Sequence, residues 1–161
     1  MRRMRVAAVC GAAVVTAVGG VAPAAGTPGA VRGGEIGLAY HGSAGIVGDR
    51  VDVRFTPHNH GAAAVPDSVV RIRWSQPLEE GQTLPARCAP EGDRAVRCRV
   101  GRLGAHDTGE RIGMRVRLRE APTEVLLEFD PVGSDGTVDE SRAAAERQRV
   151  LVLDTGDTYY F

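Results

Sequence analysis

The sequence predicts an all-β protein, a sandwich of about seven antiparallel strands closed by one disulfide. Three observations support this prediction. Apolar residues recur with a period of two over several short segments, as is typical of strands with one buried face. Turn-forming residues separate these segments, and the chain contains 21 glycines. Finally, Cys88 and Cys98 lie close enough in the sequence to pair across a short loop.

The strands are expected where the alternation is strongest. Residues 51–55 place Val51, Val53 and Phe55 on one face and charged side chains on the other. Later segments alternate apolar residues with charged ones, mostly arginine, and one short run near the end is wholly apolar. Residues 139–148, with alanines flanked by charges, are expected to form a helical turn or two within a loop. The predicted strands are residues 51–55, 70–74, 96–100, 114–118, 125–129 and 150–153.

Residues 1–24 have the composition of a signal peptide. Three arginines near the start precede an apolar stretch, residues 6–21, and the sequence Ala22-Pro23-Ala24 matches the small-x-small pattern of a cleavage site. A membrane anchor is the alternative, but Ala and Gly dominate the stretch and Pro23 interrupts its end. We therefore expect an exported, extracellular chain with no membrane span after cleavage. It would consist of a flexible leader (residues 25–34) and one domain (residues 35–161).

The charges of the chain are balanced, with 20 basic and 20 acidic residues, and every basic residue is Arg. Loss of residues 1–24 removes three arginines and no acid, so the expected mature chain carries a net charge of −3. Aromatic residues make up only 4% of the sequence, so the chain has few side chains on which bases could stack. Nucleic acid is therefore not an expected partner.

The cysteines favour an oxidising environment. Cys10 would leave with the signal peptide, so Cys88 and Cys98 remain as an even pair in an exported chain. A redox or metal-binding pair is the alternative, but the spacing is not that of C-x-x-C and no third ligand lies nearby in the sequence. The pair is predicted to form a disulfide, worth about 3 kcal/mol in the chain-entropy model.

Several short motifs occur in an order that resembles one known family. An Asn-His-Gly turn stands at residues 59–61, a Pro-Leu-Glu-Glu-Gly turn at residues 77–81, and Cys88 precedes the segment 96–103 (Val-Arg-Cys-Arg-Val-Gly-Arg-Leu). Over roughly residues 45–155 this order resembles the conserved-repeat immunoglobulin-like domain of bacterial surface and secreted proteins. The resemblance implies an extracellular immunoglobulin-like sandwich that acts as a spacer, stalk or adhesive element, without catalysis.

Seven arginines alternate with apolar residues and should point away from the core. If their strands were neighbours in one sheet, they would form a positive outer face able to bind an anionic envelope polymer or an acidic protein, because guanidinium groups suit phosphate and carboxylate. The alternative is a solvated face with cross-strand pairs to Glu and Asp. The candidate residues are Arg71, Arg73, Arg97, Arg99, Arg115, Arg117 and Arg119.

The best metal candidates are His58 and His60, because residues two apart on a strand share a face. His41 and His106 are possible additions, but His60 also belongs to the Asn-His-Gly turn, and no Cys or carboxylate stands at ligand spacing. We interpret these histidines as turn residues and predict no metal or cofactor. The acids around residues 130–139 lack the spacing of an EF-hand and are interpreted as a polar turn.

Catalytic patterns are weak in this sequence. No serine lies in a G-x-S-x-G motif, no free cysteine remains in the expected mature chain, and Glu79-Glu80 lies in an exposed turn. The sequence therefore favours a secreted, non-catalytic binding or structural module of the bacterial cell envelope, with its oligomeric state left open. The alternative is a small metal-binding protein or an enzyme inhibitor that presents Arg94 and Arg97 on the Cys88–Cys98 loop.

Overall fold

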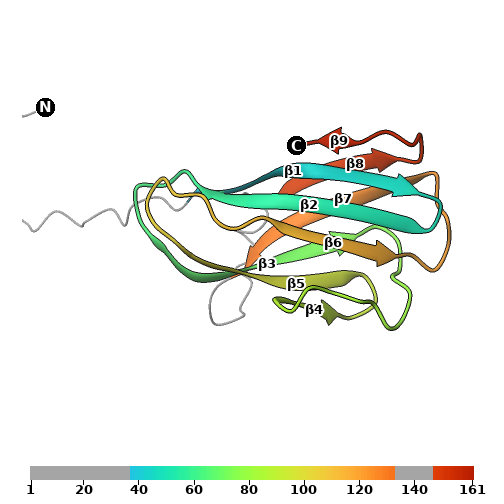
Figure 1. The fold of residues 1–161 in the computed structure, drawn as a ribbon, viewed down its shortest axis with the longest axis horizontal. Coiled ribbons are helices and arrows are strands. Elements are labelled where there is room, and N and C mark those ends of the chain that lie inside the picture. Colours follow the sequence, from blue (N-terminus) through green and yellow to red (C-terminus); the bar gives the residue numbers. More distant parts are fainter. Residues whose placement is uncertain (1–36, 133–146) are drawn as a thin grey trace, which may run out of the picture. The chain divides into compact units, whose positions relative to one another are not determined.

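The computed structural model describes residues 37–132 and 147–161, which form two antiparallel β-sheets (Figure 1). The predicted signal peptide and leader, and nearly all of the segment expected to be helical, lie outside the described residues. The described part of the chain contains no helix, and so none that could span a membrane. Its strands are β1 (Leu38–Val47), β2 (Arg50–Asn59), β3 (Val65–Trp74), β4 (Cys88–Glu91), β5 (Ala95–Leu103), β6 (Ile112–Arg117), β7 (Glu124–Val132), β8 (Gln148–Leu153) and β9 (Tyr159–Tyr160).

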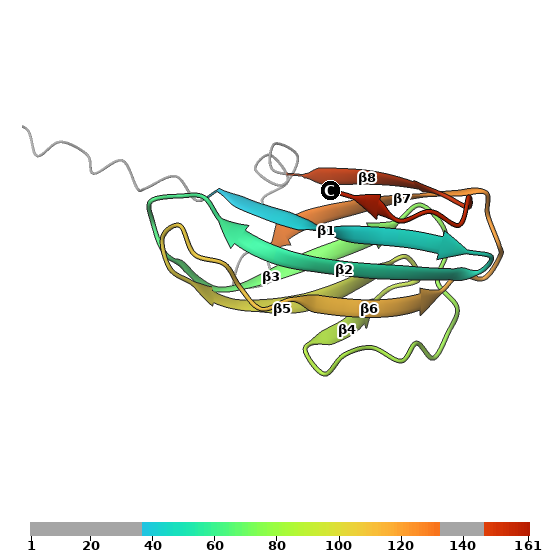
Figure 2. The same cartoon turned by 45° about the horizontal axis from the view of Figure 1, so that its top comes forward.

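The strand order is that of an immunoglobulin-like sandwich. One sheet has the order β6-β2-β1-β9 and the other β4-β5-β3-β7-β8. The chain makes a hairpin with β1 and β2, crosses to the other sheet for β3 to β5, returns for β6 beside β2, and crosses again for β7 beside β3. These crossings give a Greek-key sandwich, with the two sheets face to face (Figure 2). The predicted fold class is confirmed.

The core lies between the two sheets, and its residues come from alternate strand positions. All six predicted strands are present, and the apolar residues at their alternating positions are buried, whereas Leu151 and Leu153 of the wholly apolar run on β8 are exposed. Tyr40, Phe55 and Phe129 form an aromatic group at the centre, with ring centroids 5.4 to 5.8 Å apart. Trp74 is buried on β3, the third strand of the fold, as in many immunoglobulin domains.

The sequence pattern did not predict β1, β4 and β9. In β1 the buried positions are filled partly by small residues, so the apolar alternation is weak. Gly42 is required there, because a Cβ at this position would lie 2.0 Å from the carbonyl oxygen of Arg54. Gly42 also exchanges two backbone hydrogen bonds with Phe161, of 2.8 and 3.1 Å, which continue the ladder between β1 and β9.

Two glutamine side chains pair with the backbone as strands do. The amide of Gln148 accepts from the N–H of Tyr40 (3.1 Å) and donates to its carbonyl (2.8 Å), just beyond Phe161 on the edge of β1. The amide of Gln82 makes the same two bonds to Arg117 on the edge of β6, at 3.0 and 2.6 Å. Gln148 thereby joins the two sheets, because it belongs to β8.

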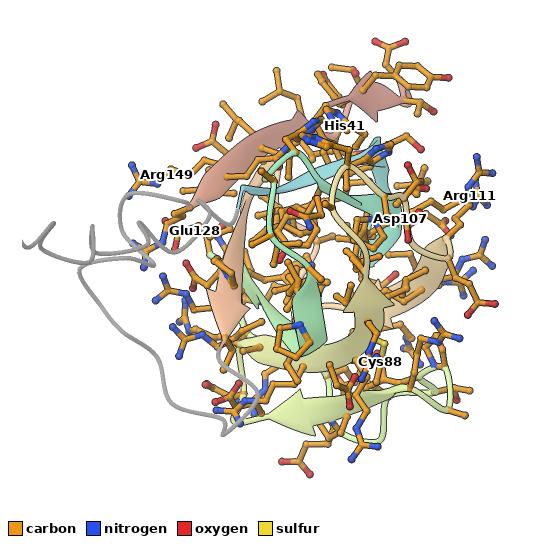
Figure 3. All side chains as sticks on the ribbon, turned by 90° about the vertical axis from the view of Figure 1, so that its left-hand side faces the viewer. His41, Cys88, Asp107, Arg111, Glu128 and Arg149 are labelled. Atoms are coloured by element: carbon orange, nitrogen blue, oxygen red, sulfur yellow. A yellow bond between two sulfur atoms is a disulfide. The ribbon has the colours of Figure 1, made fainter. Side chains whose placement is uncertain are left out.

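The predicted disulfide is confirmed. Cys88 and Cys98 lie directly opposite each other on β4 and β5, with their Cα atoms 4.1 Å apart (Figure 3). The bond ties the four-residue edge strand β4 to the sheet, and Cys98 is fully buried in the core.

The Asn-His-Gly motif forms a turn built on a buried side chain. The Asn59 amide is almost fully buried; its oxygen accepts from the N–H of Gly61 (3.0 Å), and its nitrogen donates to the carbonyls of Ala63 (2.8 Å) and Gly104 (2.7 Å). Asn59 therefore joins two loops at the same end of the sandwich and fixes where the chain leaves β2.

Candidate anion-binding site and histidine cluster

The structure divides the seven candidate arginines between the two sheets. Arg71 and Arg73 on β3, with Arg97 and Arg99 on β5, belong to the five-stranded sheet, whereas the other three lie on or just after β6 in the four-stranded sheet. All seven point away from the core, as expected. Because their strands belong to different sheets, they do not form the single positive face that the sequence analysis considered.

The buried carboxylate of Asp130 forms ion pairs with arginines on the outer face of the five-stranded sheet. Asp130 on β7 is fully buried, and its oxygens lie 3.2 Å from Arg71 Nη2, 3.0 Å from Arg73 Nε and 2.6 Å from Arg147 Nε. Arg71 and Arg73 lie on β3 and Asp130 on the neighbouring β7, so these two contacts are cross-strand pairs, whereas Arg147 directly precedes β8. With its carboxylate already engaged, Asp130 is poorly suited to a calcium loop; its possible partners Asp135 and Asp139 lie outside the described residues.

Other arginines of this sheet also have acid partners. Glu128 is 3.0 Å from both Arg73 and Arg149, and Figure 3 shows Glu128 and Arg149 next to each other. Arg97 Nε is 2.7 Å from Glu91, and this hydrogen bond raises the pKa of Arg97. Arg99 is exposed and has no carboxylate partner in the part of the chain that the structure describes.

On the four-stranded sheet, Arg115 pairs with Asp52 at 3.0 Å and Arg117 with Asp49 at 3.4 Å. Arg119 donates to the carbonyl of Leu78 at 3.2 Å. Five of the seven candidates therefore pair with Asp or Glu, which is the alternative that the sequence left open.

Three arginines that the sequence did not single out, Arg54, Arg102 and Arg111, have no acid partner among residues 37–132 and 147–161, and two of them lie on or beside the four-stranded sheet. Arg54 lies on the outer face of β2, where its side chain passes over Gly113. Arg111 precedes β6 and extends away from the ribbon (Figure 3). The nearby carboxylate of Glu110 pairs with Arg87 instead. The only sequence signal for Arg54 was its polar position in the alternating segment 51–55.

Arg54 and Arg111 line a shallow hollow of about 280 Å³ on the outer face of the four-stranded sheet. Among the described residues, no Asp or Glu lines it. The neighbouring hollow, of about 180 Å³, does contain acids, Asp52 and Asp157, and shares Arg54. We call the first the Arg54–Arg111 hollow; its lining residues are His41, Gly42, Ser43, Arg54, Phe55, Thr56, Arg111 and Tyr160.

Three histidine rings cluster at one end of the same outer face. The ring centroids are 4.8 Å apart for His41 and His58, and 5.8 Å apart for His41 and His60 and for His58 and His60. Partial burial lowers the pKa of His58, and the neighbouring His41 and His60 lower it further. In the present side-chain positions, the described residues contain no three His, Cys, Asp or Glu groups arranged to hold a metal ion.

The sequence identified two members of this cluster, and the structure adds His41 from β1. His58 and His60 share one face as expected, and His60 also belongs to the predicted turn. His106 makes no ring contact with the cluster among the described residues; it lies in a loop with φ at 55°, and its N–H donates to the carbonyl of Gly61.

The loop considered for an enzyme inhibitor has its arginines engaged within the chain. Arg94 donates to the carbonyl of Ser75, and Arg97 pairs with Glu91. To place either guanidinium in a specificity pocket, an inhibitor would have to break these contacts, which weakens this interpretation.

In comparisons with known proteins, no family model matches the chain, and no curated protein is similar to it in sequence.

Proposed function

We propose that this protein is a secreted, non-catalytic binding module of the bacterial cell envelope that binds an anionic envelope polymer in the Arg54–Arg111 hollow. One observation carries the proposal: two exposed guanidinium groups without acid partners in the described residues share a hollow that no carboxylate lines. Export is supported by the signal-peptide composition of residues 1–24 and by the disulfide. The resemblance to the conserved-repeat immunoglobulin-like domain supports a binding or structural role.

The acid partners of Arg115 and Arg117 make this hollow the favoured site on the four-stranded sheet. Arg115 already has the Asp52 carboxylate within 3.0 Å, so an external anion would have to compete with that partner. Arg54 and Arg111 have no such competitor in the described structure. The expected mature chain has a net charge of −3, so attraction of an anion depends on a local positive region rather than on the whole molecule.

The lining residues suit phosphate or carboxylate groups carried on a polymer. Guanidinium groups bind such anions with two parallel hydrogen bonds, and the hydroxyls of Ser43, Thr56 and Tyr160 are further donors along the hollow. A shallow, open hollow accommodates one unit of a chain that continues across the surface of the sheet.

Binding of the full chain to soluble poly(glycerol phosphate) tests the proposal, with dextran as the neutral comparison. We expect binding that weakens with salt and that is lost in the double variant Arg54→Gln, Arg111→Gln. The matched control, Arg115→Gln with Arg117→Gln, removes the same charge from the same sheet and should keep most of the binding. Equal losses in the two double variants would show that net charge, not the hollow, is responsible.

A further inference from the structure

We propose that His41, His58 and His60 form a binding site for a divalent transition metal ion of the Zn²⁺ type. This inference goes beyond the proposed function, because the site uses three imidazoles and does not require Arg54 or Arg111. It rests on the way two neighbouring strands bring the rings together.

The backbone places the three rings at separations that suit a tripod of ligands. His58 is the penultimate residue of β2 and His60 is the first residue after that strand, while His41 lies on β1, which pairs with β2 along its whole length. An imidazole nitrogen binds Zn²⁺ at 2.0–2.1 Å, so two rings on a tetrahedral ion have centroids about 5 Å apart. The observed separations of 4.8, 5.8 and 5.8 Å are close to this value.

Binding requires the rings to rotate, because their nitrogens do not converge in the present positions. His41 and His60 are exposed, and neither ring has a hydrogen-bond partner in the described residues. Rotation of exposed side chains is fast and costs little. The backbone of both residues is nevertheless fixed: His41 pairs with Thr56 in the β1–β2 ladder, and the N–H of His60, just past β2, donates to the carbonyl of Gly37 at 2.8 Å.

The third ring is already oriented by a neighbour. His58 Nδ1 lies 3.1 Å from the hydroxyl of Thr108, and His58 and Thr108 form a β-bridge. The N–H of Thr108 donates in turn to the carboxylate of Asp107 at 2.8 Å. A hydrogen bond at Nδ1 leaves Nε2 as the metal ligand, which is the usual arrangement around a metal-bound imidazole.

Three protein ligands leave a fourth position open to water or to a group from a partner. Neutral imidazoles add no charge, so the bound ion would be a local centre of positive charge on this face. His41 also lines the Arg54–Arg111 hollow, so an anion bound in the hollow would be a neighbour of the ion. Metal binding nevertheless does not depend on the hollow, so the two proposals can be tested separately.

Titration of the untagged, metal-free full chain tests the site, with Zn²⁺ followed by calorimetry and Co²⁺ by its visible absorption. We expect one ion per chain, and a fall in affinity of about tenfold or more in each of His41→Ala, His58→Gln and His60→Ala. The matched control is His106→Ala, which removes the histidine outside the cluster and should bind as the parent does. Thr108→Val should lower the affinity by about tenfold without removing a ligand.

Three results would overturn the inference. They are the absence of saturable binding, an equal loss in the His106 variant, and a loss confined to two of the three cluster histidines. Melting curves of the variants without metal separate loss of a ligand from loss of the fold. The double variant Arg54→Gln, Arg111→Gln should retain metal binding, so that failure of the anion proposal and failure of the metal proposal are distinguishable.

Discussion

Replacement of Asp130 by Asn tests how strongly the buried carboxylate stabilises the five-stranded sheet. The substitution keeps the size of the side chain but removes the negative charge that faces Arg71, Arg73 and Arg147. Three guanidinium groups would then face one another across an amide. We expect a large loss of stability with little change in the fold.

The magnitude follows from burial. Removing one partner of a buried ion pair costs about 3 to 5 kcal/mol. The side chains of Arg71 and Arg147 keep 15% of their surface exposed, so water still screens them in part and the lower end applies, about 3 kcal/mol. The matched control is Asp52→Asn, which breaks the Arg115 pair on the other sheet, where the two side chains are 62% and 41% exposed. Such a surface pair contributes about 0 to 1 kcal/mol.

Urea unfolding at pH 7 measures both variants. With a slope of about 1.5 kcal/mol per molar urea, Asp130→Asn should lower the midpoint by about 2 M and Asp52→Asn by well under 1 M. Equal shifts for the two variants, or no shift for Asp130→Asn, would refute the argument that burial makes this carboxylate important.

Two further changes test the fold. Cys98→Ala should lower the free energy of unfolding by about 3 kcal/mol through loss of the disulfide, whereas His60→Ala should leave it nearly unchanged, and equal melting shifts would contradict this. Gly42→Ala should lower stability by about 3 kcal/mol or more, because its Cβ would collide with the backbone of β2. Gly45→Ala on the same strand meets its nearest atom at 3.4 Å and should be tolerated; comparable denaturation midpoints for the two alanine variants would argue against a close approach at Gly42.

The fold could be predicted where side chains alternate strongly. The segments around Val53, Ile72 and Leu127 each combine buried apolar positions with charged ones, and each is a strand. The strand β1 was not predicted because Gly42 and Gly45 interrupt its alternation of apolar and polar residues, although its backbone pairs fully with β2. Local sequence carries little signal where a strand depends on close backbone approach rather than on large apolar side chains.

The candidate site depends on information that a local pattern lacks. Alternation indicates that Arg73 and Arg115 both point outward, but not that they lie on different sheets. It cannot show that Asp130 lies between arginines of β3, or that His41 is close to His58, because both contacts depend on strand order and register. The two histidines that the sequence singled out, His58 and His60, are two residues apart, so their spacing alone predicts a common face.

The glutamine amides described above have a consequence for association between molecules. Exposed sheet edges offer unpaired N–H and C=O groups to the strands of other chains, and this is a common route to aggregation. The side chain of Gln148 already occupies the backbone N–H and C=O of Tyr40. The side chain of Gln82 occupies the same two groups of Arg117. An incoming strand would have to displace an intramolecular amide before it could extend the sheet at either place. Each glutamine therefore acts as a one-residue strand that ends the sheet at its position and disfavours edge-to-edge association there.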